Sequence, residues 1–367
     1  MMLLVFAIFI ACTAIQLCYY LFIFSRFSSL KPTKKETIDI PISVLICARN
    51  EAKNLQQFLP KILQQNYPNF EVILINDRSF DATLEVMESF KEKYPSKIKI
   101  VNVAETKNGG SKKHALSLGI KSANHEHLLF TDADCTPNSD NWIHEMSQHF
   151  TPNKSIVLGV GAYRTIQNSW LNKLIRFETL MTALQYVSYA NIGIPYMGVG
   201  RNLAYTKSLF FDNNGFASHL HLKSGDDDLF VNQHATKENV SVSLHPDSFT
   251  ISEPKTTFND WINQKRRHIS TANYYKPLHQ FLLGLYYSSQ LLFWGLGILL
   301  LAFGYQWKIV LGLFFIRIAV QYIIISKTSK KLNEKGLLLW TPFLEIFLIL
   351  TQLFIFIKNL VSKPTHW

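Results

Sequence analysis

The chain has 367 residues, of which 48% are hydrophobic and only 17% are charged. This composition argues against an ordinary water-soluble protein, because the apolar residues are concentrated at the two ends and leave one soluble region between about residues 31 and 276. The formal net charge is +11, but the basic residues flank apolar stretches and no nucleic-acid recognition motif is present. This placement favours a membrane surface as the partner and argues against nucleic acid.

The first expected element is a transmembrane anchor over residues 1–25. The run from Met1 to Phe24 carries no charge and is long enough to cross a bilayer as a helix. Its basic residues follow it, whereas a cleaved signal peptide carries them in front. We therefore expect an uncleaved anchor with its N-terminus outside and the following domain in the cytoplasm.

Residues 40–275 are expected to form an α/β domain whose first half, 40–136, alternates strands with helices. Short β-branched apolar runs predict strands at 41–48, 70–75, 98–103 and 127–131. Helical patterns occupy the intervening residues 53–65, 82–94 and 113–121. This alternation predicts a Rossmann-like, mostly parallel sheet with helices on both faces.

Polar residues follow three of the expected strands. They are Arg49-Asn50-Glu51, Asn76-Asp77 and Asp132-Ala133-Asp134. Because the carboxyl ends of parallel strands lie at one edge of a sheet, where α/β proteins bind ligands, we expect these residues to form one site. The sequence contains neither a G-x-G-x-x-G fingerprint nor a P-loop, so a dinucleotide site and a P-loop phosphate site are not expected.

Asp132 and Asp134 are the expected metal ligands. The small Ala133 separates them directly after a buried strand, so both carboxylates can turn toward one hard cation. Mg²⁺ and Mn²⁺ prefer carboxylate and phosphate oxygens, and such a cation neutralises a diphosphate leaving group. The alternative is a solvated turn that Asp134 merely caps.

Residues 41–136 resemble the nucleotide-binding half of the inverting family 2 glycosyltransferases, which have the GT-A fold. The turn Asn76–Asp81 is similar to the Asp-Asp-Gly-Ser-Thr-Asp turn of that family, which implies that Asp77 hydrogen-bonds the nucleotide base, commonly uracil. Gly110–Leu116 is similar to the family's Gly-Lys-x-x-Ala-Leu segment, which implies that Lys112 approaches the diphosphate or the sugar. The resemblance thus implies a nucleotide sugar, expected to be UDP-linked, as the donor. The loop after the first strand is expected in the same site: Ala48, Arg49, Asn50 and Glu51.

Residues 137–275 are expected to form the acceptor half of the domain. The segment 198–205 resembles a glycine-rich strand of the family, which implies that Gly200 and Asn202 lie near the acceptor or the diphosphate. Three consecutive aspartates follow at 226–228, in the position of the family's Glu-Asp or Gly-Asp-Asp motif. An inverting transfer needs one carboxylate to take the proton from the acceptor hydroxyl. One alignment of the motif selects Asp226, which we prefer, and the other selects Asp227; Asp228 also stays open.

Residues 264–268 resemble the Gln-x-x-Arg-Trp motif of the processive, polymer-making members of the family. Gln264 and Arg267 match the motif, and His268 stands where the family has tryptophan. The resemblance implies that these three side chains contact the diphosphate or the acceptor. The histidine weakens the case for a processive enzyme.

Three further apolar segments predict C-terminal transmembrane helices at 280–302, 308–326 and 337–357, the last of which could instead be re-entrant or interfacial. Arg317 and Glu345 lie near the middle of two of them, where an ionisable group is costly unless it is paired or faces water. We expect the two residues to pair; the alternative is that they line a path for an acceptor or a lipid. The four cysteines have no metal-ligand spacing and are expected to be free thiols.

The sequence therefore predicts an inverting glycosyltransferase of the cell membrane with a cytoplasmic catalytic domain. It would move a sugar from a nucleotide sugar to a lipid-linked or membrane-proximal acceptor, with Mg²⁺ or Mn²⁺ as cofactor. One alternative is a processive polysaccharide synthase with a short channel. The other, from a different class, is a catalytically silent membrane scaffold that keeps the fold.

Overall fold

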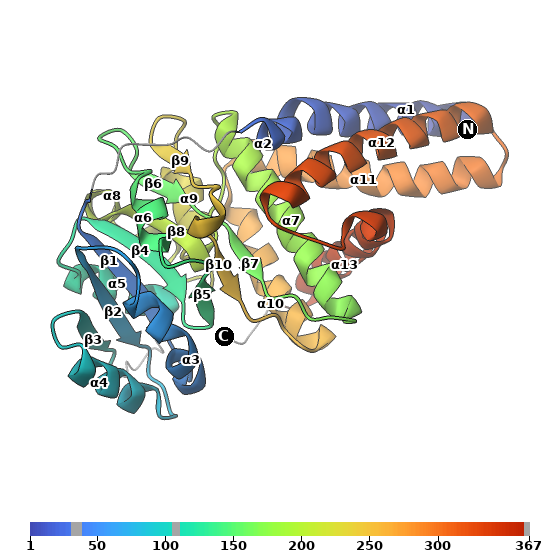
Figure 1. Cartoon of the computed structure of the whole chain (residues 1–367). Coiled ribbons are helices and arrows are strands. Elements are labelled where there is room, and N and C mark those ends of the chain that lie inside the picture. Colours follow the sequence, from blue (N-terminus) through green and yellow to red (C-terminus); the bar gives the residue numbers. More distant parts are fainter. Residues whose placement is uncertain (31–38, 105–110, 363–367) are drawn as a thin grey trace. The chain divides into compact units, whose positions relative to one another are not determined.

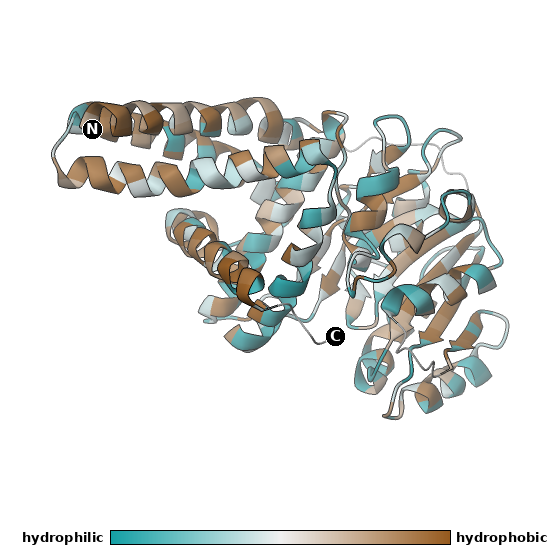
Figure 2. Cartoon of the chain, turned by 180° about the vertical axis from the view of Figure 1, so that it is seen from behind, coloured by the Kyte–Doolittle hydropathy of each residue, from teal (hydrophilic) through white to brown (hydrophobic). Residues whose placement is uncertain are grey.

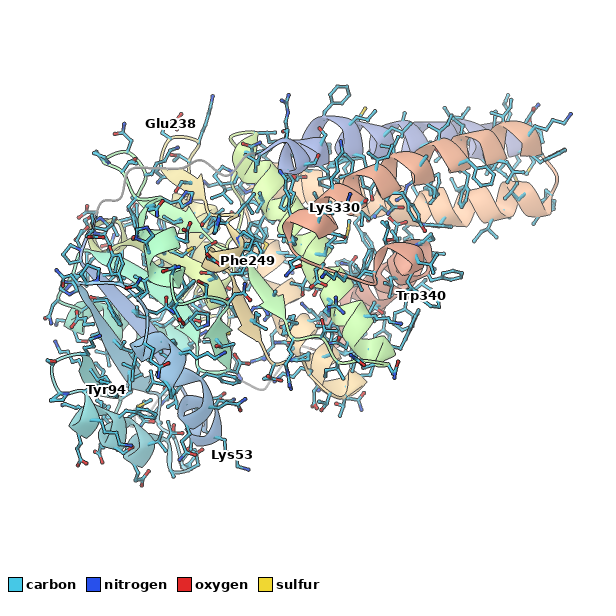
Figure 3. The ribbon with its side chains drawn as sticks, viewed as in Figure 1. Lys53, Tyr94, Glu238, Phe249, Lys330 and Trp340 are labelled. Atoms are coloured by element: carbon cyan, nitrogen blue, oxygen red, sulfur yellow. The ribbon has the colours of Figure 1, made fainter. Side chains whose placement is uncertain are left out.

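The computed structural model describes residues 1–30, 39–104 and 111–362, which form two compact units. We call the first the sheet unit, residues 39–104, 111–166 and 193–255. We call the second the helical unit, residues 1–30, 167–192 and 256–362. Residues expected in the acceptor half therefore contribute to both units. Figure 1 labels the elements, and Figure 3 adds the side chains.

The sheet unit is built on a seven-stranded sheet with the strand order β3-β2-β1-β4-β8-β6-β9. The first four of these strands are mutually parallel, and β8 is antiparallel to both of its neighbours. A smaller sheet has the order β5-β10-β7. The strands are β1 (Ile42–Ala48), β2 (Phe70–Asn76), β3 (Ile98–Asn102), β4 (His127–Asp132), β5 (Cys135–Pro137), β6 (Ile156–Leu158), β7 (Gly161–Tyr163), β8 (Leu203–Thr206), β9 (Val240–Val242) and β10 (Thr250–Ser252). The mostly parallel sheet confirms the expected architecture.

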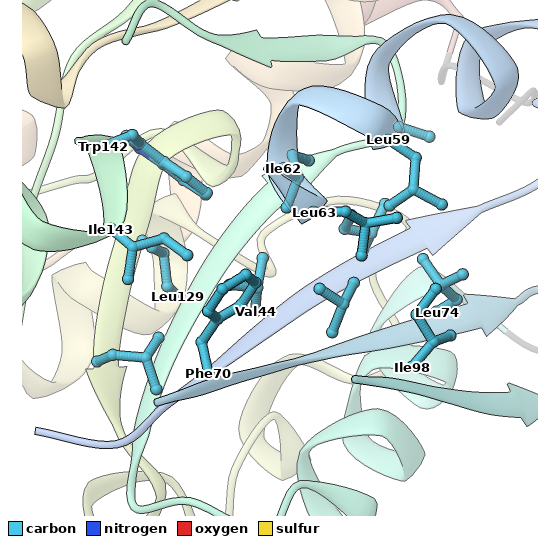
Figure 4. Close-up of a cluster of buried hydrophobic side chains, with 14 of the residues drawn as sticks. Val44, Leu59, Ile62, Leu63, Phe70, Leu74, Ile98, Leu129, Trp142 and Ile143 are labelled. Atoms are coloured by element: carbon cyan, nitrogen blue, oxygen red, sulfur yellow. The ribbon is translucent and has the colours of Figure 1, made fainter. Parts of the chain in front are cut away.

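Helices cover both faces of the large sheet because its strands are apolar on both sides. Val44 belongs to a buried cluster that also contains Leu59 of α3 and Trp142 of α6 (Figure 4). Ile75 points to the opposite face, where a Cβ on Gly119 of α5 would lie only 2.2 Å from its Cδ1 atom. The glycine therefore permits the close approach of α5. The helices are α3 (Ala52–Leu63), α4 (Thr83–Lys93), α5 (Lys112–Ser122), α6 (Trp142–Ser147), α8 (Lys207–Asp212) and α9 (Asp228–His234).

The glycine-rich segment at 198–205 is not one continuous strand, contrary to the expectation. A 3-10 turn, η2, covers Gly200–Asn202, and β8 begins only at Leu203. The turn forms because the backbone N–H of Asn202 donates to the carbonyl of Val199 at 2.9 Å. The amide of Asn202 is also buried and donates to the carbonyls of two other segments, which holds this residue out of the regular ladder.

Four helices of the helical unit are long and apolar enough to cross a membrane. They cover Met2–Ser29, Pro277–Ala302, Trp307–Lys331 and Leu338–Val361. Each contains nearly all of one expected span, and their apolar character is visible in Figure 2. The first comprises α1 (Met2–Cys18), the π-helix η1 (Tyr19–Phe24) and α2 (Ser25–Ser29), and the others are α11 (Pro277–Ala302), α12 (Trp307–Lys331) and α13 (Thr341–Val361). All four cysteines of the chain are free, as expected.

Two further helices, α7 (Trp170–Asn191) and α10 (Phe258–Thr271), also belong to the helical unit. An ion pair of 2.5 Å joins Lys265 of α10 to Glu178 of α7. Arg176 of α7 donates from Nε to Glu334, in the loop between α12 and α13, at 2.9 Å. Helix α7 is therefore tied by charge both to α10 and to the loop between two of the long apolar helices.

A buried ion pair joins α12 to α13. The Nη1 and Nη2 atoms of Arg317 donate to the two carboxylate oxygens of Glu345 at 2.8 and 2.6 Å. This confirms the expected pairing. Amide and indole groups on α1, α11 and α12 itself also hydrogen-bond the two charges; they belong to Gln16, Gln290, Trp294 and Gln321. Because α1 contributes Gln16 and α11 contributes two of these groups, one polar network joins all four long apolar helices.

The losses of stability from substituting Arg317 and Glu345 should not be additive. Arg317→Met or Glu345→Leu leaves one buried charge without its partner, which costs about 3–5 kcal/mol in comparable pairs. The double variant removes both charges and is expected to lose less stability than the sum of the single losses. Thermal unfolding of the detergent-purified protein measures this, with Lys308→Met at an exposed position of α12 as the control. Additive losses would contradict the coupling.

Candidate functional site

The polar residues that follow β1, β2 and β4 lie together at one edge of the sheet, as the sequence predicts. In the parallel ladders, Ala48 lies opposite Asn76, and Cys47 lies opposite Asp132. The three strands thus end at the same level. The backbone N–H of Asp77 then donates to the carbonyl of Ala48 at 2.9 Å, which joins the loops that follow β1 and β2.

The Lys112 ammonium group lies between two aspartates of this edge. Its Nζ atom is 2.9 Å from Oδ1 of Asp132 and 3.1 Å from Oδ2 of Asp226. Burial by itself lowers the pKa of Lys112, but the two carboxylates reverse the effect and raise it above its usual range. The three side chains line a small pocket with Gly200 and Asp227. The ammonium group of Lys112 therefore pairs with both Asp132, a candidate metal ligand, and Asp226, a candidate base.

Asp132, Asp134 and Cys135 are close enough to hold a metal ion together, with ligand atoms within 4.8 Å of one another. Burial and the charge of Asp132 raise the pKa of Asp134, which indicates carboxylates that repel each other. The Cys135 thiol is 3.3 Å from Oδ1 of Asp134 and hydrogen-bonds Oγ of Ser252 at 2.9 Å. Burial raises the pKa of this thiol well above its usual range, so Cys135 is a neutral neighbour that orients Asp134. The two aspartates supply the hard oxygen ligands that Mg²⁺ and Mn²⁺ prefer.

Arg201 is a second cation near these aspartates, and the sequence analysis missed it. Its guanidinium donates to the carbonyl of Gly161 at 3.1 Å and lies 4.2 Å from the centre of the Tyr163 ring. From there its charge lowers the pKa of both Asp132 and Asp134, in opposition to the larger effect of burial. The one feature of the sequence that could have identified Arg201 is its position between Gly200 and Asn202, which were both predicted in the site.

The three consecutive aspartates have different environments. Both carboxylate oxygens of Asp227 accept backbone hydrogen bonds, one from Gly200 at 2.7 Å and one from Asp228 at 2.8 Å. Oδ1 of Asp228 accepts from the N–H of Leu229 at 2.7 Å. Asp226 instead has the side chain of Lys112 as its charged neighbour. Asp227 therefore fixes the backbone, whereas the carboxylate of Asp226 lies beside the expected ligands of the metal.

Lys113 and His219 hold the loop that leads to these aspartates, and the sequence analysis identified neither. The buried Lys113 Nζ donates to the carbonyls of Ser224, at 2.9 Å, and His219. The His219 imidazole donates from Nε2 to the carbonyl of Gly225 at 2.9 Å. Burial lowers the pKa of Lys113 to about 8, although the charges of Asp226 and Asp228 oppose the shift. At the start of α5, Lys112 thus contacts Asp132, and the adjacent Lys113 contacts the loop that precedes Asp226.

The turn after β2 holds Asp77 with one carboxylate oxygen engaged. Oδ1 of Asp77 accepts from Nε and Nη2 of Arg78 at 2.8 and 2.5 Å. Its Oδ2 atom is buried and has no hydrogen-bond partner among the described residues. Asn50, after β1, accepts from the N–H of Phe80 at 2.8 Å, which fastens the two loops to each other. The turn therefore presents a buried acceptor atom at the sheet edge.

Ala48, Arg49 and Glu51 are the other residues that were predicted in the site from the loop after β1. Ala48 is buried at the end of its strand, and Arg49 is half-buried beside it. The Glu51 carboxylate accepts from the Asn54 amide at 2.5 Å. Burial raises the pKa of Glu51, and the metal-ligand candidates Asp132 and Asp134 raise it further. Glu51 thus lies within electrostatic reach of those aspartates.

The predicted acceptor residues divide between the two units. Asn202 is fully buried, and its Oδ1 accepts from Nε1 of Trp142 at 3.0 Å, so its amide fixes the turn that carries Gly200. Gln264, Arg267 and His268 lie on α10 of the helical unit, and their contact with diphosphate or acceptor stays a prediction. On the same helix, Arg266 donates to Ser362 at the end of α13. Gly110, at the start of the lysine segment, lies outside the described residues.

Two family models match the chain. The model described as Glycosyl transferase family 2 matches residues 43–210, and the one described as Glycosyl transferase family group 2 matches residues 127–357. Poly-beta-1,6-N-acetyl-D-glucosamine synthase of Staphylococcus epidermidis is 32% identical over 176 residues, which cover 47% of this chain and 39% of that protein. Glycosyltransferase AglE of Haloferax volcanii is 27% identical over 193 residues, 50% of this chain and 58% of that protein. The chain therefore spans less than two thirds of either relative.

A solved structure resembles nearly the whole chain. It is the mannosyltransferase PcManGT of Pyrobaculum calidifontis in complex with GDP-Man and Mn²⁺, with a TM-score of 0.62 and 18% identity. The match covers 91% of this chain and 99% of that one. At this identity the likeness is one of fold, and it confirms the expected GT-A fold.

The ligand-free protein should become less stable as Asp227 ionises. Burial, then Asp226 and Asp228, raise the pKa of Asp227 from 3.8 to about 8. Between these values the folded state holds a proton that the unfolded state has lost. The stabilisation is therefore complete below pH 3.8 and is lost as the pH rises toward 8.

Melting temperatures across this pH range test the expectation. They should fall more steeply with pH for the wild type than for Asp227→Asn. The control is Asp212→Asn, the same chemical change at an exposed position of α8. A wild-type slope no steeper than that of Asp227→Asn would contradict the assignment.

Proposed function

Because the chain belongs to the family 2 glycosyltransferases, we propose that it transfers a sugar, with inversion, from a UDP-sugar to a lipid-linked or membrane-proximal acceptor. The observation that carries this proposal is the convergence at one sheet edge of a buried acceptor atom, two candidate metal ligands and a separate carboxylate. These are the groups that base recognition, diphosphate binding and proton removal each require. They belong to Asp77, Asp132, Asp134 and Asp226.

Asp77 is the residue that we propose selects the base. Its Oδ1 atom already accepts two hydrogen bonds from Arg78, and only Oδ2 is open among the described residues. One open oxygen matches the single ring N–H donor of uracil. Guanine carries two donors on the equivalent edge, a ring N–H and an amino group. Oδ2 can serve only one of them well, and a buried donor without a partner costs about 1–3 kcal/mol.

Asp132 and Asp134 are the proposed ligands of Mg²⁺ or Mn²⁺. Their oxygens lie close together, and burial and then the charge of Asp132 raise the pKa of Asp134; a cation bound between them would relieve that repulsion. A divalent cation at this position supplies charge neutralisation for the diphosphate as it leaves. Lys112 adds a further positive charge on the same side of the pocket.

Asp226 is the proposed base, and Asp227 is a positioning residue. A base must have an oxygen that can approach the acceptor hydroxyl. Both oxygens of Asp227 are used by backbone N–H groups, whereas Asp226 lies beside Lys112 in the pocket. Asp227 holds Gly200, where an added Cβ would lie 3.2 Å from Oδ2 of Asp227, so the glycine lets the backbone reach this carboxylate.

The membrane is the proposed location of the acceptor. Four helices of the described residues are long and apolar enough to cross it. The end of α12 and the loop after it carry four lysines, at positions 327, 330, 331 and 335, as cytoplasmic flanks commonly do. We propose that residues 40–275 supply the catalytic domain on the cytoplasmic side. A lipid-linked or membrane-proximal acceptor would then be held near the donor site by its own anchor.

A processive polysaccharide synthase is the second candidate. The relative at 32% identity is named as a synthase of a polymer of N-acetylglucosamine, which favours this function. His268 in place of the motif tryptophan argues against it. Mass spectrometry of the products distinguishes the two: a single added sugar supports one transfer per acceptor, and a ladder of lengths supports a synthase.

Asp226→Asn should abolish most of the transfer while leaving donor binding intact. Loss of a general base lowers the rate by about 10²–10⁴-fold. Asp227→Asn should raise KM more than it lowers kcat, because the substitution disturbs the turn at Gly200. UDP release and product mass report transfer by the detergent-purified protein, and Asp212→Asn is the control. If Asp226→Asn retains most of the transfer activity and Asp227→Asn does not, the base assignment is wrong.

Asp134→Ala tests the metal ligands separately. Removal of one carboxylate ligand should eliminate most of the Mn²⁺-dependent donor turnover, since the diphosphate charge is then poorly neutralised. Donor hydrolysis can be measured even when the acceptor is unknown. Mn²⁺-dependent hydrolysis at wild-type rates by this variant would contradict the assignment of the metal.

A further inference from the structure

We propose that Lys112 is an internal cation that competes with the metal for Asp132, so that the divalent ion binds tightly only when a nucleotide diphosphate is present. This inference rests on the proposed function, because it concerns the same donor site. The observation is the position of the ammonium group, 2.9 Å from Oδ1 of Asp132 and 3.1 Å from Oδ2 of Asp226. One amine thus neutralises the metal-ligand candidate and the base candidate together.

The fold holds Lys112 at this position. The residue is the first of α5, and the preceding Ser111 caps the helix by accepting a hydrogen bond from the N–H of His114. Gly119 brings the same helix into close contact with the sheet. The Lys112 side chain is only 18% exposed and that of Asp226 only 12%. The ammonium therefore lies in a confined pocket, where solvent screens charges less than at an open surface.

Repulsion between the Lys112 ammonium group and a divalent ion then decides whether the ion can bind at Asp132. A divalent ion that shares Asp132 with the ammonium group meets a positive charge at close range, and the cost is large in a partly buried site. Lys112 has a better arrangement when a diphosphate is present, because the phosphate oxygens offer the ammonium new acceptors. Lys112 can then leave Asp132 free for the divalent ion.

The departure of Lys112 from Asp132 would also change the environment of Asp226, the proposed general base. The same ammonium neutralises Asp226, so its movement toward a diphosphate frees the carboxylate that takes the proton from the acceptor. Donor binding and release of the base would thus be one event. In thermodynamic terms, the affinities for nucleotide and for metal are coupled, and the coupling is reciprocal.

Mn²⁺ binding to the purified full-length protein tests the inference without any measurement of activity. The electron paramagnetic resonance signal of free Mn²⁺ reports the ion that remains unbound, at low ionic strength and with or without saturating UDP. For the wild type, UDP should tighten Mn²⁺ binding by about tenfold or more, within the usual range of coupling between sites. For Lys112→Met, binding of Mn²⁺ alone should be about tenfold tighter than for the wild type, and the effect of UDP should shrink.

A matched control separates direct competition from a general loss of positive charge. Lys255 is exposed, and its charge acts on Asp134 from a distance. Lys255→Met removes the same charge and should change Mn²⁺ affinity by less than about threefold, because a charge exposed to water acts through a high effective dielectric constant. Lys112→Gln repeats the test with a polar side chain if the methionine variant does not fold.

Two outcomes would overturn the inference. One is that neither Lys112 variant binds Mn²⁺ alone more tightly than the wild type does. The other is that Lys255→Met strengthens binding as much as Lys112→Met does. A wild type that binds no Mn²⁺ even with UDP would instead refute the proposed function, and this inference would be lost with it.

Discussion

The concentration of carboxylates at one edge of a parallel sheet is the constraint on which the site depends. Asp132, Asp134, Asp226 and Asp227 repel one another, and the repulsion grows where water is excluded. The fold offsets it with few positive groups. Lys112 pairs with two of the carboxylates, and the charge of Arg201 acts on the candidate metal ligands. Asp227 accepts hydrogen bonds from two backbone N–H groups, and burial raises its pKa to about 8. The site therefore suits a nucleotide diphosphate that binds together with a divalent cation.

The helical unit meets the same physical problem with a different solution. Arg317 and Glu345 are buried among long apolar helices, where a single charge would be very costly. The two side chains make a bidentate pair, and amide groups of Gln290 and Gln16 add further hydrogen bonds to the two charges. The pair therefore fixes how the long helices pack together. In the sheet unit the ammonium group of Lys112 lies between two like charges. In the helical unit two opposite charges pair directly with each other.

Local sequence patterns were sufficient to predict the first half of the fold. Runs such as Ile42–Ala48 and Phe70–Asn76 are β-branched and apolar on both sides, which is typical of buried parallel strands. Once the strands are parallel, their carboxyl ends must lie at one edge of the sheet. The placement of Asp77 and Asp132 at the same edge therefore followed from the topology. The pairing of Arg317 with Glu345 was predictable for a similar reason, because few other partners are available to a charge within a membrane span.

Contacts between distant segments were not predictable. Lys113 lies beside Lys112 in the sequence, yet only the fold brings the carbonyls of the loop at 219–224 to it. The distinct environment of Asp227 likewise depends on the turn at Gly200, 27 positions away. A run of three aspartates carries no local signal that says which one will meet backbone N–H groups. Helices α7 and α10 are joined to each other by Lys265–Glu178, and Arg176–Glu334 and Arg266–Ser362 join them to segments beside α12 and α13; each of these contacts links residues far apart in the chain.

The most direct test of the account is the stabilisation of the purified protein by nucleotides in the presence of Mn²⁺. A ligand that binds only the folded state raises the melting temperature by mass action. The account predicts that UDP and UDP-sugars stabilise the wild type much more than GDP or ADP do, and that Asp77→Asn and Asp134→Ala each remove the effect. Equal stabilisation by GDP, or UDP stabilisation that survives both substitutions, would contradict the assignment of this sheet edge as the donor site.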